Sequence, residues 1–157
     1  MLIACDRPSS PVHHAHPNHS TFAEGTIGRE LDDFHDAAAH ADEPRYFAHF
    51  ATAGVFLGTD ATERWDVASF RAYAHARFSK GRSWTFHVDR RTVTVAQDGM
   101  HAWFEETLRG EKLGPARGSG VFVHEDGKWL IAQYNLSLTI PNERFTEVRT
   151  LLDRPRR

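Results

Sequence analysis

The chain has 157 residues, of which 40% are hydrophobic and 25% are charged, and its formal net charge at pH 7 is −2. These proportions are ordinary for one soluble globular domain, and the length is enough to bury a core. A charge balance so close to neutral excludes the basic footprint that nucleic-acid binding needs. No apolar run approaches the roughly 18 residues that cross a bilayer. We therefore expect neither a nucleic-acid partner nor a transmembrane segment.

The N-terminal part of the chain differs in composition from the rest. Residues 6–25 hold three of the seven prolines and little periodic apolar content, which is typical of a disordered segment. We predict a disordered His/Pro-rich tail over residues 1–25, followed by a single domain over residues 26–157. The tail carries four histidines that would bind a transition metal only weakly, because nothing fixes their geometry: His13, His14, His16 and His19. We expect no metal site and no cofactor.

A single cysteine, Cys5, excludes an intrachain disulfide and a thiolate metal site. Its context, "LIACD", resembles the cleavage box of a bacterial lipoprotein, which normally follows a basic segment and an apolar segment. Only "MLIA" precedes the cysteine here. We expect a cytoplasmic protein. The alternative is a periplasmic lipoprotein anchored at Cys5, if the given chain starts late.

Apolar residues at helical spacing predict a long first helix from Thr26. The apolar positions of this helix recur every three or four residues and form one stripe: Ile27, Leu31, Phe34, Ala38 and Ala41.

Two shorter helices are predicted after it. One opens at "DEP", residues 42–44, where acidic groups and an early proline suit a helix start, and it ends at Gly54. A strand over residues 55–58 follows. Asp66 suits the N-cap of the next helix, which we place at about residues 67–80.

After Gly81 the apolar period falls to two, which predicts strands. Within residues 84–95 the alternation changes parity, so we expect a bulge or bend near Arg90-Arg91. Asp98-Gly99 and Asp126-Gly127 predict hairpin turns. Further strands are predicted at residues 101–109, 116–125 and 128–140, with a terminal helix at 143–152.

Helices that are segregated from an antiparallel meander define an α+β domain. We expect the N-terminal helices to pack on a strongly bent antiparallel sheet, forming a cone with an internal cavity.

Six segments of the chain carry a family resemblance: "AAAHAD", "RYFAHFA", "VFLGTDATERW", "AWFEE", "RGSGVF" and "GKWLIAQYNLSLTIPN". From about Leu31 to Asn142 the sequence resembles a bacterial SnoaL-like family within the nuclear transport factor 2-like superfamily. The resemblance implies the cystatin-like cone and a homodimer formed through the sheet. Similar domains include cyclases, isomerases, epoxide hydrolases and dehydratases, as well as non-catalytic binding and assembly domains, so the resemblance implies no single activity and no catalytic residue.

Strand parity supplies one candidate acid or base. In "HAWFEETLR", Glu105 shares a face with Thr107 and with Trp103, which we predict to bind the ligand. If that face is buried, desolvation would raise the pKa of Glu105 and make it a proton donor or acceptor near neutral pH. The alternative is that Glu105 points to solvent and Glu106 is the buried carboxylate.

A second candidate follows the strand at residues 55–58. In the stretch "TDATERWD", we expect Asp60 and Trp65 to lie at the rim of the cavity, with Asp60 as acceptor or base and Trp65 over an apolar ligand. The alternative is that Glu63 and Arg64 pair on the surface and Trp65 packs in the core.

The remaining predicted ligand-binding residues lie on the second helix and on the last two strands. The "RGSG" segment, residues 117–120, weakens a strand unless a ligand, helix or subunit approaches it closely. Arg117 could form an ion pair or hold a ligand carboxylate. Gln133 and Tyr134 lie on opposite faces of the last strand, and Tyr46 completes the set.

Three functions are compatible with these residues. The first is a cofactor-independent isomerase, cyclase, dehydratase or hydrolase of a small apolar molecule, with Asp60 and Glu105 as acid and base. The second is a module that binds a small ligand without reacting. The third is a homo-oligomerisation domain.

Overall fold

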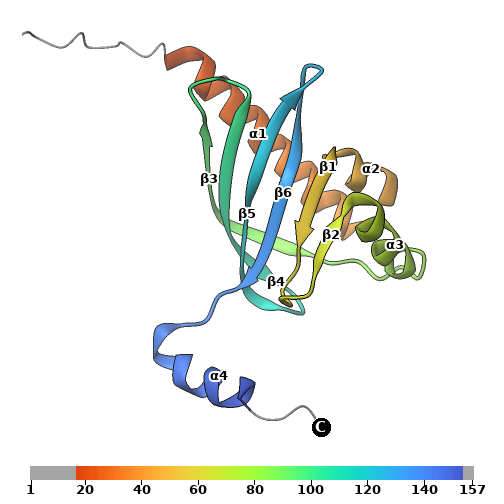
Figure 1. Ribbon diagram of the computed structural model, residues 1–157, viewed down its shortest axis with the longest axis vertical. Coiled ribbons are helices and arrows are strands. Elements are labelled where there is room, and N and C mark those ends of the chain that lie inside the picture. The colour runs from red at the N-terminus through yellow and green to blue at the C-terminus, as the bar shows by residue number, and fades with distance from the viewer. Residues whose placement is uncertain (1–16, 154–157) are drawn as a thin grey trace, which may run out of the picture.

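The computed structural model describes residues 17–153 (Figure 1). Helix α1 (Pro17–Ala39) begins at Pro17, so the predicted boundary at residue 26 is placed too late. The apolar stripe misses the first turns because they bury little: Phe22 is 75% exposed, and Ile27 is the first core residue along the helix. Cys5 and the histidines at 13, 14 and 16 lie outside the described residues, so the lipid anchor and the disorder of residues 1–16 stay predictions.

The three predicted N-terminal helices are confirmed. The stripe of α1 is buried at Ile27, Leu31, Phe34 and Ala38. Helix α2 (Glu43–Ala48) opens at Asp42, whose side chain accepts a hydrogen bond from the Arg45 backbone N–H. Helix α3 (Val67–Phe78) opens at Asp66, which accepts from the Ser69 N–H at 2.7 Å. Both carboxylates satisfy an otherwise unpaired donor in the first turn of a helix.

One six-stranded sheet forms the other layer, in the order β2-β1-β6-β5-β4-β3. Strands β3 to β6 make the predicted antiparallel meander, but β1 pairs with β6 in parallel, so the sheet is mixed rather than purely antiparallel. The short edge strand β2 was not predicted. The strands are β1 (Phe50–Leu57), β2 (Arg64–Asp66), β3 (Phe86–Val95), β4 (His101–Gly110), β5 (Gly114–Glu125) and β6 (Lys128–Leu138).

Strand β1 starts at Phe50 rather than at the predicted Val55, and its register against β6 shifts between these two residues. Gly54 lies in this irregular stretch. A Cβ atom there would lie 2.9 Å from the backbone oxygens of Ala51 and Ile131, which is too close for a side chain. Gly54 therefore permits a close backbone approach within the sheet and does not end a helix.

Two bulges turn the strand faces. The register of β3 against β4 shifts between Val88 and Arg90, next to the predicted bend. In β6, Ile131 pairs with Phe122 while Gln133 pairs with Val121, which leaves one extra residue on β6. Ile131 and Tyr134 are consequently both buried, although their sequence parity differs.

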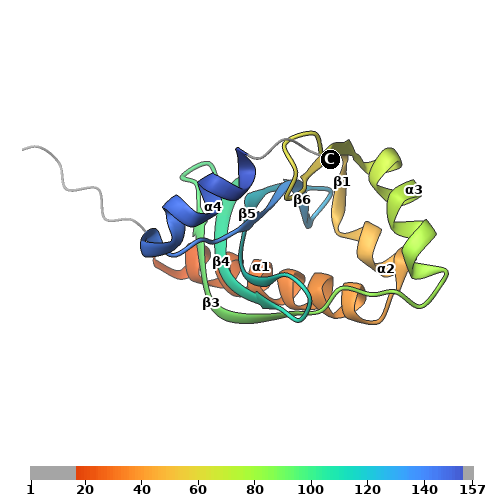
Figure 2. The same ribbon diagram turned by 90° about the horizontal axis from the view of Figure 1, so that it is seen from below.

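The sheet curves around the helices (Figure 2). Helix α1 crosses its concave side, and α2 and α3 lie at the β1 end. The core between these layers is rich in aromatic rings: Phe56 stacks on Phe70 at 4.0 Å and on Tyr134 at 5.7 Å between ring centroids. The predicted terminal helix is present as α4 (Phe145–Leu152), after a 3₁₀ turn at Asn142–Arg144, and it has no buried residue. Each helix in the described part is too short or too polar to cross a bilayer.

Candidate functional site

A cleft of about 510 Å³ lies where strand β1 leaves the sheet. Its walls come from the β1–β2 connection, from α3, from the segment that joins α3 to β3, and from the β4–β5 hairpin. The lining residues are Phe56, Gly58, Thr59, Glu63, Trp65, Phe70, Tyr73, Arg77, Arg82, Ser83, Trp84, Lys112, Leu113 and Leu136.

Aromatic side chains dominate the cleft. The rings of Trp65 and Tyr73 lie 5.0 Å apart, and Tyr73 also stacks with Phe70 at 6.5 Å. Trp84 packs against Phe78 at 4.6 Å. An apolar lining with a few polar groups at its edge is the usual make-up of a small-molecule site.

The edge of the cleft carries four ionisable side chains: Glu63, Arg77, Arg82 and Lys112. The guanidinium of Arg77 lies over the Tyr73 ring at 4.4 Å and donates to the Tyr73 hydroxyl at 2.6 Å. The Glu63 side chain folds back over Gly58, where a Cβ atom would come within 2.1 Å of Glu63 Oε2. A side chain at position 58 would therefore displace the Glu63 carboxylate.

A much smaller cavity, of about 10 Å³, lies deeper in the cone. Phe56, Trp84 and Leu136 line both spaces and so form the partition between them. A space of this size has room for at most about one water molecule. The cavity is lined by Phe34, His35, Ala38, Tyr46, Phe56, Trp84, Phe86, Tyr134 and Leu136.

A buried polar cluster adjoins this small cavity. His35 Nε2 lies 2.8 Å from Glu106 Oε2, and Arg91 Nε donates to Glu106 Oε1 at 2.7 Å. Arg91 Nη1 also donates to the Gly28 carbonyl at 2.7 Å and to Asp32 at 2.8 Å. The cluster therefore joins β4 and β3 to helix α1.

Glu106 is 1% exposed. Burial raises the pKa of its carboxyl, but the hydrogen bonds and positive charges of His35 and Arg91 outweigh this effect and leave the pKa below its usual value. Glu106 is thus a carboxylate held ionised in the core by its partners.

The Tyr134 hydroxyl also meets this carboxylate. Burial raises the pKa of Tyr134 well above its ordinary value, and the Glu106 charge and hydrogen bond raise it further, so Tyr134 is a neutral phenol that donates. A Cβ atom at Gly118 would lie 2.4 Å from the Tyr134 hydroxyl and 3.1 Å from Glu106 Oε2. A close approach to "RGSG" was predicted, and the groups that approach are side chains of the same chain.

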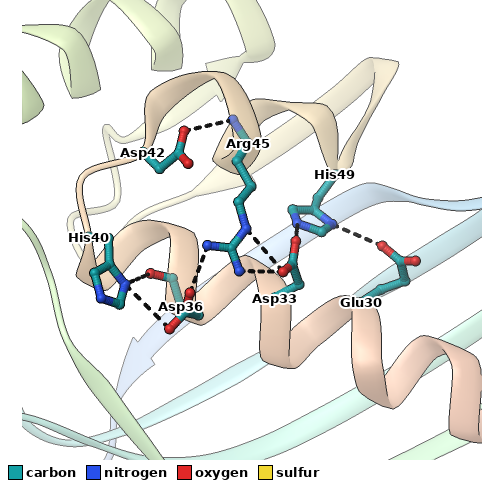
Figure 3. A network of polar contacts seen from close by, with 7 residues as sticks. All are labelled: Glu30, Asp33, Asp36, His40, Asp42, Arg45 and His49. Carbon is teal, nitrogen blue, oxygen red and sulfur yellow. Dashed lines mark hydrogen bonds and ion pairs between the residues drawn. The ribbon is translucent and has the colours of Figure 1, made fainter.

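A second polar network ties α1 to α2 (Figure 3). His49 is 6% exposed and lies between Glu30, at 3.1 Å from Nδ1, and Asp33, at 2.9 Å from Nε2. Arg45 donates to Asp33 and, at 2.7 Å, to Asp36. The hydrogen bond and charge of Arg45 lower the pKa of Asp33 in spite of some desolvation. No group of three or more His, Cys, Asp or Glu side chains within residues 17–153 is placed to hold a metal ion.

The structure brings three of the eight predicted site residues to these spaces. Trp65 lines the cleft, and the buried rings of Tyr46 and Tyr134 line the small cavity. The other five line neither space and are exposed: Asp60, Trp103, Glu105, Arg117 and Gln133.

The prediction for Glu105 therefore needs correction. Glu105 lies on the outer face of β4, and its neighbour Trp103 on that face is 52% exposed. The alternative, with Glu106 as the buried carboxylate, is the arrangement in the structure. Asp60 lies in the exposed turn after β1, where its carboxylate accepts from the Thr62 N–H at 2.9 Å.

The sequence interpretation missed His35, Arg91 and the cations at the edge of the cleft. A signal for Arg91 was available. The predicted turn at Asp98-Gly99 pairs Val95 with Ala102, and counting back along both strands places Arg91 opposite Glu106. A buried carboxylate needs such a partner. No comparable signal points to His35, because only the packing of α1 on the sheet brings it to Glu106.

The SnoaL-like domain family matches residues 27–141 of this sequence. The chain belongs to the SnoaL-like family. No curated protein matches it by sequence.

Solved structures share this fold, which is of the cystatin-like type. An NTF2-like protein of unknown function from Pseudomonas putida KT2440 is similar with a TM-score of 0.67 at 18% identity, over 79% of this chain and 92% of that one. A provisionally assigned dehydratase of the NTF2-like family from Streptomyces avermitilis has a TM-score of 0.61 at 14% identity, over 74% and 96%. A provisionally assigned calcium/calmodulin-dependent protein kinase II association domain from Xanthomonas campestris has a TM-score of 0.56 at 25% identity, over 74% and 86%.

Proposed function

We propose that this SnoaL-like domain binds a small organic molecule in the cleft formed by α3, the β1–β2 connection and the β4–β5 hairpin. The observation that carries the proposal is the cleft itself, of about 510 Å³ and with the rings of Trp65, Tyr73 and Trp84 in its walls. Ligand sites of this kind typically have volumes of about 300–1,000 Å³ and mostly apolar walls. Flat apolar ligands gain both area burial and ring contacts from such a surface.

The small, deeper cavity is a less suitable place for a ligand than the cleft. At about 10 Å³ it has no room for an organic ligand unless the partition of Phe56, Trp84 and Leu136 moves. The carboxylates first predicted as catalytic, Asp60 and Glu105, line neither space. The cleft is therefore the site on which the function rests.

Binding can be tested with N-phenyl-1-naphthylamine, a neutral aromatic probe whose fluorescence rises in apolar surroundings. We expect saturable binding that Trp65→Ala weakens at least about tenfold, because the indole supplies much of the apolar wall. Phe22→Ala is the control, since Phe22 is 75% exposed on α1 and does not line the cleft. Both variants should retain the wild-type circular dichroism. Absence of binding, or equal effects of the two substitutions, would contradict the proposal.

A second candidate function is acid–base catalysis at the buried cluster. The observation that favours it is the hydrogen bond of 2.8 Å between His35 and Glu106, beside Tyr134 at the small cavity. A carboxylate that orients a histidine is a common way to prepare a general acid or base. His35 would transfer the proton, and Glu106 would hold the ring in position.

This second candidate predicts turnover, not only binding. Small molecules extracted from the expressing cells can be incubated with the wild type and with His35→Asn, and followed by mass spectrometry. A compound consumed only by the wild type would support catalysis. A compound that binds the cleft and stays unchanged over long incubation would support binding and contradict catalysis.

We further propose that a second copy of the chain covers the outer face of the sheet, as the family resemblance implies. Trp103, 52% exposed on that face, supports this proposal. Light scattering at micromolar concentration should give the mass of a dimer, and Trp103→Glu should give that of a monomer. A wild-type monomer would contradict the homodimer.

A further inference from the structure

We propose that the ligand of the cleft is an organic anion, with a flat apolar body and one anionic group that lies between Arg77, Arg82 and Lys112. This inference rests on the proposed binding function and adds the chemical class of the ligand. It is drawn from the charges at the edge of the cleft and from the way the fold gathers them.

The first observation is the balance of charge at the cleft. Three cations and one carboxylate line it, which gives a local charge of +2, whereas the whole chain has a net charge of −2. Among the described residues, no carboxylate lies within ion-pair distance of Arg77, Arg82 or Lys112. A concave site lined by one sign of charge attracts ligands of the opposite sign.

The second observation is that the end of α3 brings two of these cations together. Gly81 has a φ of +65°, which reverses the chain just after the helix. The Arg82 backbone N–H then donates to the Arg77 carbonyl at 3.0 Å. This turn fixes the backbone of Arg82 beside the last turn of α3, where Arg77 lies.

The third observation concerns the preorganisation of Arg77. Its guanidinium is held over the Tyr73 ring at 4.4 Å, and one of its nitrogens donates to the Tyr73 hydroxyl at 2.6 Å. A guanidinium carries five N–H donors, so others stay available for a carboxylate or phosphate. Because stacking already orders the side chain, less entropy is lost when an anion binds.

Lys112 approaches the same space from the β4–β5 hairpin, next to Leu113. The apolar rings lie in the walls, and the cations lie at the edge, where the side chains of Arg82 and Lys112 are exposed. An amphipathic acid would satisfy both parts at once, with its ring system against Trp65 and Trp84 and its anion toward solvent. A neutral apolar molecule would use only the walls.

Two fluorescent probes that differ by one group test this inference. 8-Anilinonaphthalene-1-sulfonate is N-phenyl-1-naphthylamine with an added sulfonate. We expect the wild type to bind the sulfonate about tenfold more tightly than the neutral probe, since two or three exposed charge contacts each contribute modestly. That preference should diminish between 20 mM and 500 mM salt.

The double variant Arg82→Gln/Lys112→Gln should remove most of the preference, so that it binds the two probes with similar affinity. Arg29→Gln/Lys128→Gln is the matched control, because it removes two exposed cations that do not line the cleft. This control variant should bind both probes like the wild type.

Competition distinguishes the kinds of anion. 1-Naphthoate or 1-naphthyl phosphate should displace the sulfonate probe, and the one that acts at the lower concentration identifies the group that the cations prefer. The neutral analogue 1-naphthamide should displace the probe only at a concentration about tenfold higher.

The two proposals fail differently. If the wild type binds both probes equally, or if the cleft and control double variants behave alike, the anion inference is wrong while ligand binding stands. If neither probe binds, the proposed function itself fails.

Discussion

The cone has two regions whose charged side chains are satisfied in different ways: its base, which is the buried cluster around Glu106, and its mouth, which is the edge of the cleft. At its base, Glu106 is buried with His35, Arg91 and Tyr134 as partners. At its mouth, Arg82 and Lys112 are exposed and have no carboxylate partner within the described part of the chain. The space at the base is about 10 Å³, whereas the cleft at the mouth is about 510 Å³.

This difference separates groups that stabilise the fold from groups available to a ligand. A buried charge must be satisfied inside the protein, because its desolvation is costly. An exposed charge keeps its water and can exchange that water for a ligand at little cost to stability. Substitutions at the base should therefore change the free energy of unfolding, and substitutions at the mouth should change binding.

The largest expected effect is the loss of the buried carboxylate. Glu106→Ala should destabilise the protein by about 3–5 kcal/mol, because Arg91 then remains partly buried with only Asp32 as an ionic partner. Glu105→Ala, at the adjacent exposed position, should change stability by less than about 0.5 kcal/mol. Urea unfolding of both variants measures the difference. Equal effects would mean that the base does not stabilise the fold in this way.

A lower pH should also reduce the stability that the buried cluster around Glu106 gives to the fold. Since the pKa of Glu106 is lowered in the folded state, its contribution to stability is present above the unfolded pKa and is lost as pH falls through the folded one. Asp33, Asp66, Asp89 and Asp98 have lowered pKa values too and add to the wild-type slope. Urea unfolding between pH 7 and pH 3 should therefore show a smaller loss of stability in Glu106→Ala than in the wild type. Parallel curves would contradict the ionised state of Glu106.

A smaller change should follow from adding one methyl group at the base. Gly118→Ala would place Cβ 2.4 Å from the Tyr134 hydroxyl, and such overpacking costs about 1–3 kcal/mol. Tyr134→Phe removes that hydroxyl, so the double variant should lose less than the sum of the two single variants. Gly25→Ala is the control, because the nearest atom to its Cβ is 3.8 Å away and alanine favours a helix. Strictly additive effects at 118 and 134 would argue against this contact.

The smallest expected effect on stability lies at the mouth. Arg82→Gln and Lys112→Gln should each change the free energy of unfolding by less than about 0.5 kcal/mol, because both side chains are exposed. Chemical unfolding of the variants used for the anion experiments provides the measurement. A large loss would show that these cations support the fold, and it would blur the separation between base and mouth.

The sequence predicted much of the fold because local rules decide those parts. Asp42 and Asp66 open helices in the structure as they do in the sequence pattern, since a cap needs only residues within one turn. The turns at Asp98-Gly99 and Asp126-Gly127 connect strands as expected, and the parity change in β3 appears as a bulge. The parallel pairing of β1 with β6 was missed, because no local pattern records which distant strand lies beside another.

The candidate site was predicted less well, and Glu105 and Glu106 show why. Their two faces differ by one residue, so parity offers two choices, and the aromatic neighbour Trp103 favoured the wrong one. In β6 an extra residue places Tyr134 inward and Gln133 outward. A bulge of this kind changes which side chains reach the interior without altering the composition of the strand.

The sequence by itself determined the helices and the hairpins, because caps, turns and apolar periods act over a few residues. It also determined membership of the SnoaL-like family. Only the tertiary structure decided that His35 and Arg91 meet Glu106, and that Arg82 and Lys112 share the edge of one cleft. Those residues are far apart in the chain, and their encounters depend on the curvature and register of the sheet, which are set when all the layers pack together.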